Sequence, residues 1–132
     1  MDKIEIRVVE TEEELLEKYE YIKEVPLVNV LPRELLIKCL QVKAAMLIGE
    51  IDGEYAGTAV IEKTGDNIAV LAVSAKNNAR KLMNSFYSWA KGLGVNRVTM
   101  MSKFDRDSYE RLLGVKLLTA IYEKDLTEWE QQ

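Results

Sequence analysis

The chain has 132 residues, of which 48% are hydrophobic and 30% are charged, and its formal net charge is −4. This length suits one domain with one core, and the composition excludes a disordered protein. The sequence holds no histidine, which excludes histidine triads, imidazole zinc sites and histidine acid–base chemistry, so we expect no metal cofactor.

Two classes of partner are also disfavoured. Net acidity argues against a general nucleic-acid binder, because contacts to phosphates need a broad basic face. The start, Met1 to Glu5, lacks the basic and apolar stretches of a signal peptide, and no run approaches the roughly 18 apolar residues of a membrane span. We therefore expect a cytoplasmic protein. The single cysteine, Cys39, sits in an apolar helical pattern and is interpreted as a packed core thiol rather than a nucleophile.

The first third of the chain predicts a strand and two helices. Residues 3–9 alternate polar and apolar side chains, as a half-buried strand does. Thr11 followed by Glu14 fits a capping box and begins a helix that runs to about residue 24. Pro32 is well placed as the first residue of a second helix, which ends near residue 43.

The middle of the chain predicts three consecutive strands. Residues 45–51 and 55–61 flank Asp52-Gly53, a strong hairpin signal, so these two strands should be antiparallel neighbours. Residues 68–73 form an unbroken apolar run, which is typical of a central strand buried on both faces.

The last third predicts a long helix, a strand, a short helix and a closing strand. An apolar stripe from Ala79 to Leu93 ends before Gly94, a suitable C-cap. Residues 95–101, 105–112 and 115–122 follow as strand, helix and strand, and the tail from about residue 124 is polar. The expected order, β-α-α-β-β-β-α-β-α-β, indicates one α+β domain over residues 1–132, with helices on both faces of a sheet.

One stretch of the chain has an unusual charge. Residues 67–104 contain six basic side chains and no carboxylate: Lys76, Arg80, Lys81, Lys91, Arg97 and Lys103. The first three lie near the predicted start of the long helix, where free backbone N–H groups and the helix dipole favour an anion. A phosphorylated cofactor is the leading interpretation, and a solvated helix face is the alternative.

Several motifs resemble the GNAT superfamily of acyl-CoA-dependent N-acetyltransferases. They are the Leu-x-Val ending of the fourth strand (71–73), the Ala-x-x-x-Gly close of the long helix (90–94), Tyr-Glu-Arg-Leu-Leu-Gly-Val (109–115) and Tyr-x-Lys-x-Leu (122–126). The resemblance covers nearly the whole chain. It implies a mixed, mostly antiparallel sheet and an acetyl-CoA site, with acetyl-CoA as co-substrate.

The same resemblance assigns cofactor-binding residues. The backbone of Leu71, Ala72 and Val73 would align the pantetheine arm and thioester, and the loop that follows would bind the pyrophosphate through Ser74, Lys76, Asn77, Asn78, Ala79, Arg80 and Lys81. The loop departs from the family pattern. It is several residues shorter, and Ala79 alone matches, because Asn77 stands where the family has glycine. Asn77 or Asn78 could replace that glycine, since asparagine adopts positive φ more readily than most residues.

The catalytic assignment rests on Tyr109. By the resemblance, this tyrosine would donate a proton to the leaving thiolate, although one extra residue before Gly114 shifts its register. The alternative has the ring of Tyr109 packing on the sheet with its hydroxyl in solvent. A base could come from Glu50, Glu54 or Glu62, or from a chain of water molecules, and their spacing selects none of them.

Two functions remain open at this point. One is an N-acetyltransferase that moves an acetyl group from acetyl-CoA to a small-molecule or protein amine. The other is a catalytically degenerate GNAT-like binding or structural protein, similar to proteins of bacteriophages and virions, with the host cytoplasm or the virion as its location. The apolar segment 25–31 lies in the acceptor region of such a fold, and its exposure would indicate a protein partner or a homodimer contact.

Overall fold

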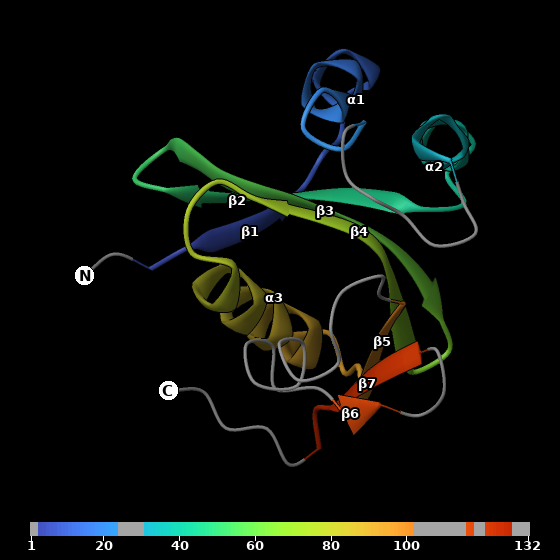
Figure 1. Ribbon diagram of the computed structural model, residues 1–132, viewed down its shortest axis with the longest axis vertical. Coiled ribbons are helices and arrows are strands. Elements are labelled where there is room, and N and C mark those ends of the chain that lie inside the picture. The colour runs from blue at the N-terminus through green and yellow to red at the C-terminus, as the bar shows by residue number, and fades with distance from the viewer. Residues whose placement is uncertain (1–2, 24–30, 102–115, 118–120, 128–132) are drawn as a thin grey trace.

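The chain folds as one mixed sheet with helices on both of its faces (Figure 1). The computed structural model describes residues 3–23, 31–101, 116–117 and 121–127. Its elements are β1 (Glu5–Val8), α1 (Glu12–Tyr19), α2 (Pro32–Leu40), β2 (Ala45–Ile51), β3 (Glu54–Thr64), β4 (Asn67–Ala75), α3 (Ala79–Gly92), β5 (Arg97–Met101), β6 (Lys116–Leu117) and β7 (Ile121–Asp125). The predicted helix over residues 105–112 lies outside the described residues.

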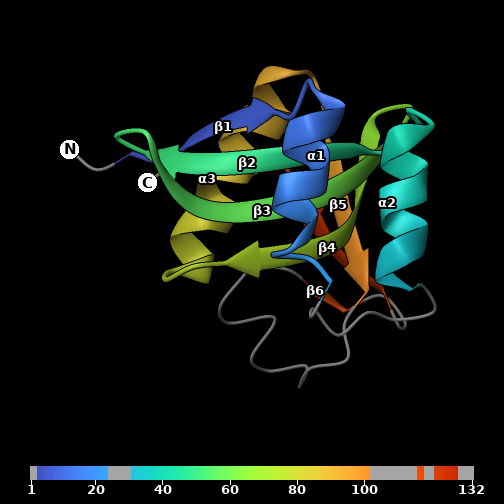
Figure 2. The ribbon, with the colours of Figure 1, turned by 90° about the horizontal axis from the view of Figure 1, so that it is seen from above.

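The sheet has seven strands in the order β1-β2-β3-β4-β5-β7-β6. Of its pairings, β4 with β5 is parallel and the others are antiparallel. Helices α1 and α2 cover one face, and α3 crosses the other (Figure 2). This confirms the predicted fold class, an α+β architecture with a mostly antiparallel sheet and helices on both faces.

The helices begin where the sequence predicts. The Thr11 side chain accepts a hydrogen bond from the Glu14 N–H (3.1 Å) and caps α1. The other half of a capping box is absent, because the Glu14 carboxylate accepts two hydrogen bonds from Arg7 instead. Pro32 opens α2, and Asn78 caps α3 by accepting a hydrogen bond from the Lys81 N–H (3.0 Å).

The predicted hairpin is present between β2 and β3. Asp52 and Gly53 both have positive φ, 52° and 82°, as a type I′ turn requires. The register carries one irregularity: Gly49 pairs with Gly57 and Glu50 with Tyr55, so Ala56 is an extra residue on β3. A β-bulge of this kind bends the end of the hairpin.

Two hydrophobic clusters form the core, one on each face of the sheet. The larger, beneath α3, contains Met83, Phe86, Tyr87 and Ala90 together with residues of β2, β3, β4 and β5. The smaller, beneath α1 and α2, includes Leu15, Ile22 and Leu35. Because β4 contributes to both clusters, the prediction that it is buried on both faces is correct.

The end of the chain differs from the prediction. A single strand was expected over residues 115–122, but β6 and β7 are two antiparallel strands, with Lys116 opposite Glu123 and Leu117 opposite Tyr122. The sequence there is mostly apolar and contains no Gly, Pro, Asn or Asp to indicate a turn. Leu126, placed in the polar tail, is buried, and its N–H donates to the Asn96 carbonyl.

Candidate functional site

Strand β4 contains a β-bulge at Leu71. Val60 pairs with Ala72 and Ile61 pairs with Val70, which leaves Leu71 without a partner on β3. The bulge reverses the inside–outside alternation. Val70 packs beneath α3, Leu71 and Ala72 both face the α1/α2 cluster, and Val73 returns to the α3 side. Bulges are common beside functional sites because they redirect side chains and interrupt pairing.

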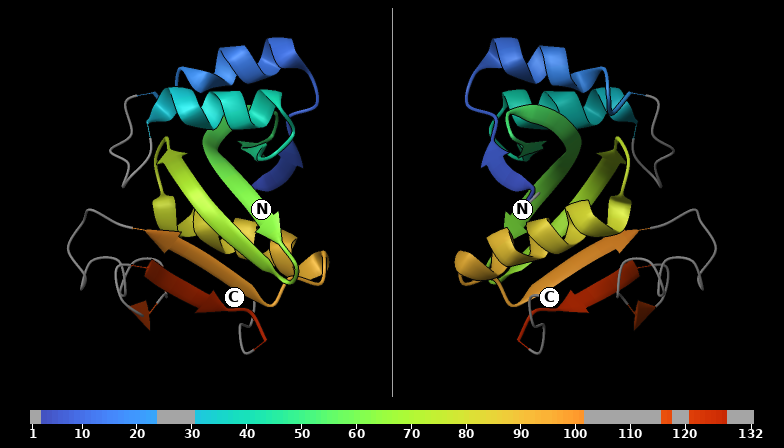
Figure 3. Two further views of the ribbon diagram at one scale, coloured as in Figure 1. Left: turned by 90° about the vertical axis from the view of Figure 1, so that its right-hand side faces the viewer. Right: turned by 90° about the vertical axis from the view of Figure 1, so that its left-hand side faces the viewer.

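Beyond this bulge, β4 and β5 separate. Their parallel pairing runs from Asn67 with Arg97 to Val70 with Met100, and it stops there in the described part of the chain. Figure 3 shows the two strands moving apart towards their C-terminal ends. The predicted pantetheine-binding residues Leu71, Ala72 and Val73 therefore lie on β4 where it no longer pairs with β5 in the described part of the chain, so their backbone groups on that side can pair with an extended ligand.

The loop from β4 to α3 provides several backbone donors. The Lys76 N–H donates to the Ala56 carbonyl (3.0 Å), which fixes the loop against the start of β3. Within the described part of the chain, the N–H groups of Asn77, Asn78, Ala79 and Arg80 donate to no acceptor. These groups lie at the positive end of the α3 dipole, which favours a bound anion.

The two asparagines do not have the left-handed backbone that would let either of them replace the missing glycine. Neither Asn77 nor Asn78 has a positive φ, and that of Asn78 is −105°. Asn78 is instead the N-cap of α3, and an N-cap residue adopts an extended backbone. The loop therefore turns into the helix without a left-handed residue, and nothing replaces the glycine that the family pattern has at this point.

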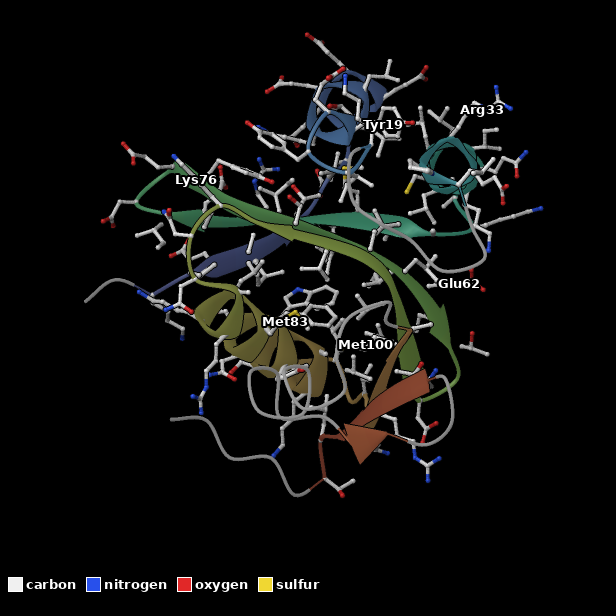
Figure 4. All side chains as sticks on the ribbon, in the orientation of Figure 1. Tyr19, Arg33, Glu62, Lys76, Met83 and Met100 are labelled. Atoms are coloured by element: carbon white, nitrogen blue, oxygen red, sulfur yellow. The ribbon has the colours of Figure 1, made fainter. Side chains whose placement is uncertain are left out.

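The basic residues of this loop do not all face the same way. Lys76, Asn77, Asn78 and Lys81 line a cavity of about 540 Å³, whereas Arg80 is not part of its lining. The cavity is completed by residues before β1 and around the β2–β3 turn, namely Ile4, Ile51, Asp52, Glu54, Tyr55 and Ala56. Figure 4 shows Lys76 beside that turn. Lys91 and Arg97 lie beyond this site, at the end of α3 and in β5, and Lys103 is outside the described residues.

The structure distinguishes among the three candidate bases. Glu50 is paired with Arg7, and Glu62 is paired with Lys38 at 2.9 Å, towards the opposite end of the sheet from Lys76 (Figure 4). Glu54 lines the cavity. Glu54 is therefore the one of the three that lies beside the loop, whereas Tyr109, the candidate acid, is outside the described residues.

One residue near this site was not predicted. Tyr55 lines the cavity, stacks on Tyr21 with ring centroids 4.0 Å apart, and shares a 2.5 Å hydrogen bond with the fully buried Thr58. Burial raises the pKa of Tyr55, although the hydrogen bond to Thr58 partly opposes this shift, so the phenol is neutral at pH 7. Its position two residues after the Asp-Gly turn was a signal that it would lie near the end of the sheet.

Within the described ranges, His, Cys, Asp and Glu side chains form no group of three or more that could hold a metal ion. No helix in the same part of the chain is long and apolar enough to cross a membrane.

Comparison with known proteins identifies the architecture. No protein-family model and no curated protein sequence matches the chain. Solved structures do match. The chain resembles a GNAT-family acetyltransferase from Brucella melitensis in complex with acetyl-CoA, with a TM-score of 0.66, 15% identity and coverage of 100% of this chain and 92% of that one.

Two further structures agree. The Escherichia coli ribosomal-protein-S18-alanine N-acetyltransferase aligns with a TM-score of 0.68 at 12% identity, over 98% of this chain and 97% of that one. A Bacillus subtilis acetyltransferase in complex with CoA aligns with a TM-score of 0.62 at 16% identity, over 89% and 79%. At these identities the likeness concerns the fold, and the chain has the fold of the GNAT acetyltransferases.

Proposed function

We propose that the protein is an N-acetyltransferase that transfers the acetyl group of acetyl-CoA to an amine. The observation that carries this proposal is the separation of β4 from β5 directly after the bulge at Leu71, next to the amide-rich start of α3. An extended, phosphorylated thioester could pair with the edge of β4 that this separation leaves. The proposal is supported by the GNAT fold and by solved structures of that fold with CoA or acetyl-CoA bound.

The acetyl transfer requires few catalytic groups from the protein. The amine nitrogen attacks the thioester carbonyl carbon, a C–N bond forms, the C–S bond breaks, and the thiolate of CoA accepts a proton. Backbone N–H groups of Leu71 to Val73 would polarise the carbonyl, and the N–H groups of Ala79 and Arg80 would bind phosphate. Glu54 or a water chain would accept the proton of the amine, and Tyr109 stays the predicted proton donor.

The test is a titration of the protein with acetyl-CoA and with CoA. Calorimetry measures the affinity, and NMR of the backbone amides locates the binding site. We expect micromolar binding, with the largest amide shifts in residues 71–80. The variant Lys76→Ala/Arg80→Ala/Lys81→Ala should bind at least about tenfold more weakly, since charge-assisted contacts to phosphate are strong. Arg33→Ala/Lys43→Ala/Lys63→Ala removes three exposed cations elsewhere and should bind as the unmodified protein does.

Binding would then justify a search for the acceptor. A peptide with an N-terminal alanine is a reasonable first choice, because the Escherichia coli enzyme with the same fold is named for that group. Release of CoA that depends on the peptide would support the transferase. Absence of heat and of amide shifts with millimolar acetyl-CoA would overturn the proposal.

A specific observation favours a second function, that of a degenerate GNAT-fold binding or structural protein. The Lys76 N–H and the Lys81 N–H are both engaged inside the protein, and the loop contains no glycine. This leaves fewer free donors, and less room for phosphate, than a glycine-rich loop provides. A protein without acetyl-CoA binding would fit this alternative. A protein partner or a homodimer contact would then be tested by pull-down and by the mass in solution, and the phage or virion origin stays a prediction.

A further inference from the structure

Helices α1 and α2 form one layer on the sheet, and the outer face of this layer is exposed. The two helices lie side by side and run in opposite directions (Figure 2). Their inner sides contribute Leu15 and Leu35 to the smaller core cluster. Because α3 lies on the opposite face of the sheet (Figure 1), the outer face of the α1/α2 layer is separate from the β4–α3 loop, where the phosphates of acyl-CoA are proposed to bind.

Three large apolar side chains lie on this outer face. Leu16 of α1 is 47% exposed, and Ile37 and Leu40 of α2 are 44% and 43% exposed. The buried positions of the two helices are Leu15 and Leu35, so the core does not use these three side chains. Apolar residues on two adjacent helices are more informative than scattered ones, because gathered apolar surface marks interaction sites.

The exposed charges around these side chains divide by helix. Those of α1 and of the residue that follows it are all acidic: Glu12, Glu13, Glu17 and Glu20. Those of α2 and of the turn that follows it are mostly basic: Arg33, Glu34 and Lys43. Within the described part of the chain, Glu12, Glu13, Arg33 and Lys43 form no ion pair. One side of the layer is therefore negative, and the other side has unpaired cations at both ends of α2.

A second copy of the chain matches both sides of this face. A two-fold axis parallel to the two helices lays α1 of one copy over α2 of the other and repeats the same contact across the axis. The start of α1 and the end of α2 lie at the same end of the layer, because the helices are antiparallel (Figure 2). This rotation therefore brings Glu12 and Glu13 towards Lys43 of the partner subunit, and Leu16 towards Leu40 of the partner subunit.

We propose that two copies of the chain form a symmetric dimer through the outer face of the α1/α2 layer, with α1 of each copy packed on α2 of the other. Charge complementarity selects this arrangement. If α1 packed on α1 instead, four carboxylates of one copy would face the same four carboxylates of the other, and like charges brought together oppose association. The inference does not depend on acyl-CoA binding.

The first measurement is the mass of the full chain in solution, by sedimentation equilibrium at low ionic strength. We expect the unmodified protein to have twice the chain mass of 15.1 kDa at concentrations of about 100 μM. Glu12→Lys/Glu13→Lys makes the start of α1 basic, and Arg33→Glu/Lys43→Glu makes both ends of α2 acidic. Each of these variants should dimerise at least about tenfold more weakly than the unmodified protein.

The two charge-reversal variants should restore the dimer when they are mixed. In a mixed dimer, the basic α1 of one variant faces the acidic α2 of the other, and the remaining acidic α1 faces the remaining basic α2. The four substitutions combined in one chain should restore the homodimer for the same reason. A contact of α1 with α1, or of α2 with α2, does not predict both of these results.

Net charge does not account for the expected pattern. Glu12→Lys/Glu13→Lys changes the formal net charge from −4 to 0, which lowers the repulsion between copies, yet this variant should dissociate. Lys3→Glu/Lys63→Glu changes net charge as Arg33→Glu/Lys43→Glu does, at exposed positions outside the layer, and should leave the dimer intact. Circular dichroism checks that each variant is folded. Leu16→Asp, which places a charge among the apolar residues at an exposed position, should also give the mass of one chain.

Three results would overturn the proposal. They are the mass of one chain for the unmodified protein at about 200 μM, a dimer that persists in both charge-reversal variants, and a mixture of these variants that stays monomeric while the unmodified protein dimerises. Titration of the monomeric variants with acetyl-CoA keeps this proposal apart from the transferase. They should bind acetyl-CoA as the unmodified protein does, so the failure of one proposal leaves the other standing.

Discussion

Val42 is the residue with the least favourable backbone in the described structure. It follows α2 with φ of +58°, and its side chain is 89% exposed. The N–H of Lys43 donates to the Lys38 carbonyl (2.8 Å) and that of Val42 to the Cys39 carbonyl (3.1 Å), which is the Schellman pattern. Glycine is the usual residue at this position, because a β-branched side chain is strained at positive φ.

Replacement of this residue should therefore stabilise the protein. We expect Val42→Gly to raise the free energy of unfolding by about 1 kcal/mol, since the strain of a left-handed non-glycine residue is relieved and little packing is lost. Urea unfolding followed by circular dichroism measures the change. Lys43→Gly, one residue further on, should give no gain. A loss of stability in Val42→Gly would show that the side chain makes contacts that its exposure does not suggest.

The Arg7 side chain joins three elements through charge. It donates to both carboxylate oxygens of Glu14 on α1 (2.7 and 2.6 Å) and to Glu50 on β2 (2.7 Å). The hydrogen bonds from Arg7 lower the pKa of Glu14, against a smaller opposing effect of burial. A lowered carboxyl pKa in the folded state means that the unfolded state takes up protons first as the pH falls.

The consequence is a pH-dependent term in stability. The contribution of Glu14 is fully present above the unfolded glutamate pKa, about 4.3, and is lost as the pH falls through its lower folded value. Between pH 7 and pH 3, the free energy of unfolding should fall further in the unmodified protein than in Glu14→Gln. The difference should be less than about 1 kcal/mol, because the Arg7–Glu14 pair is partly exposed. Urea midpoints at the two pH values measure this, and Glu13→Gln is the control. Equal losses in the protein and in Glu14→Gln would contradict the assignment.

At the scale of elements, α3 approaches the sheet over two glycines. Leu82 lies above Gly49 and Gly57, which pair with each other across β2 and β3. A Cβ atom on Gly57 would lie 2.5 Å from Leu82 Cδ2 and 2.9 Å from the Ser74 carbonyl oxygen. Because neither glycine has a side chain, the start of α3 can pack closely against the sheet at this pair. The β4–α3 loop, which precedes the helix, is held close to the sheet in the same way.

Addition of a methyl group at Gly57 should push the two elements apart. We expect Gly57→Ala to lower the free energy of unfolding by about 1–3 kcal/mol, the usual cost of overpacking. The carbonyl of Ser74 cannot move without shifting β4, so weaker acetyl-CoA binding should accompany the loss. Gly92→Ala, at the end of α3, meets nothing within 4 Å and should be neutral or slightly stabilising. A Gly57→Ala protein as stable as the parent would show that α3 adapts freely.

The accuracy of the sequence-based predictions varies between elements. Helix α3 was predicted as 79–93 and runs from Ala79 to Gly92, because a 3.6-residue stripe and the caps are local signals. The β2–β3 hairpin follows from Asp52-Gly53 for the same reason. The bulge at Leu71 and the divergence of β4 from β5 depend on contacts between distant segments, and no local pattern encodes them. The cavity was missed because only the fold brings Lys76 and Lys81 into the same lining as Asp52 and Glu54.

At the scale of the molecule, two cores share one sheet. In β2, Met46 belongs to the α1/α2 cluster and Leu47 to the α3 cluster, and in β3 Val60 and Ile61 divide in the same way. Because both clusters are built on the same strands, those strands cannot unfold beneath one cluster while they stay folded beneath the other. The expectation of a single domain over residues 1–132 therefore becomes a prediction of one cooperative unfolding transition.

Two residues report on the two clusters independently. Trp89 packs against the α3 cluster and stacks on Phe86, with ring centroids 5.9 Å apart. Cys39 packs against the α1/α2 cluster, and burial raises the pKa of its thiol to about 11, so it should react slowly with thiol reagents at pH 8 while folded. In a Trp129→Phe background, Trp89 fluorescence and the labelling rate of Cys39 should change at one urea concentration. Midpoints separated by more than about 0.5 M would show that the α1/α2 layer unfolds by itself, and that the sheet does not couple the two cores.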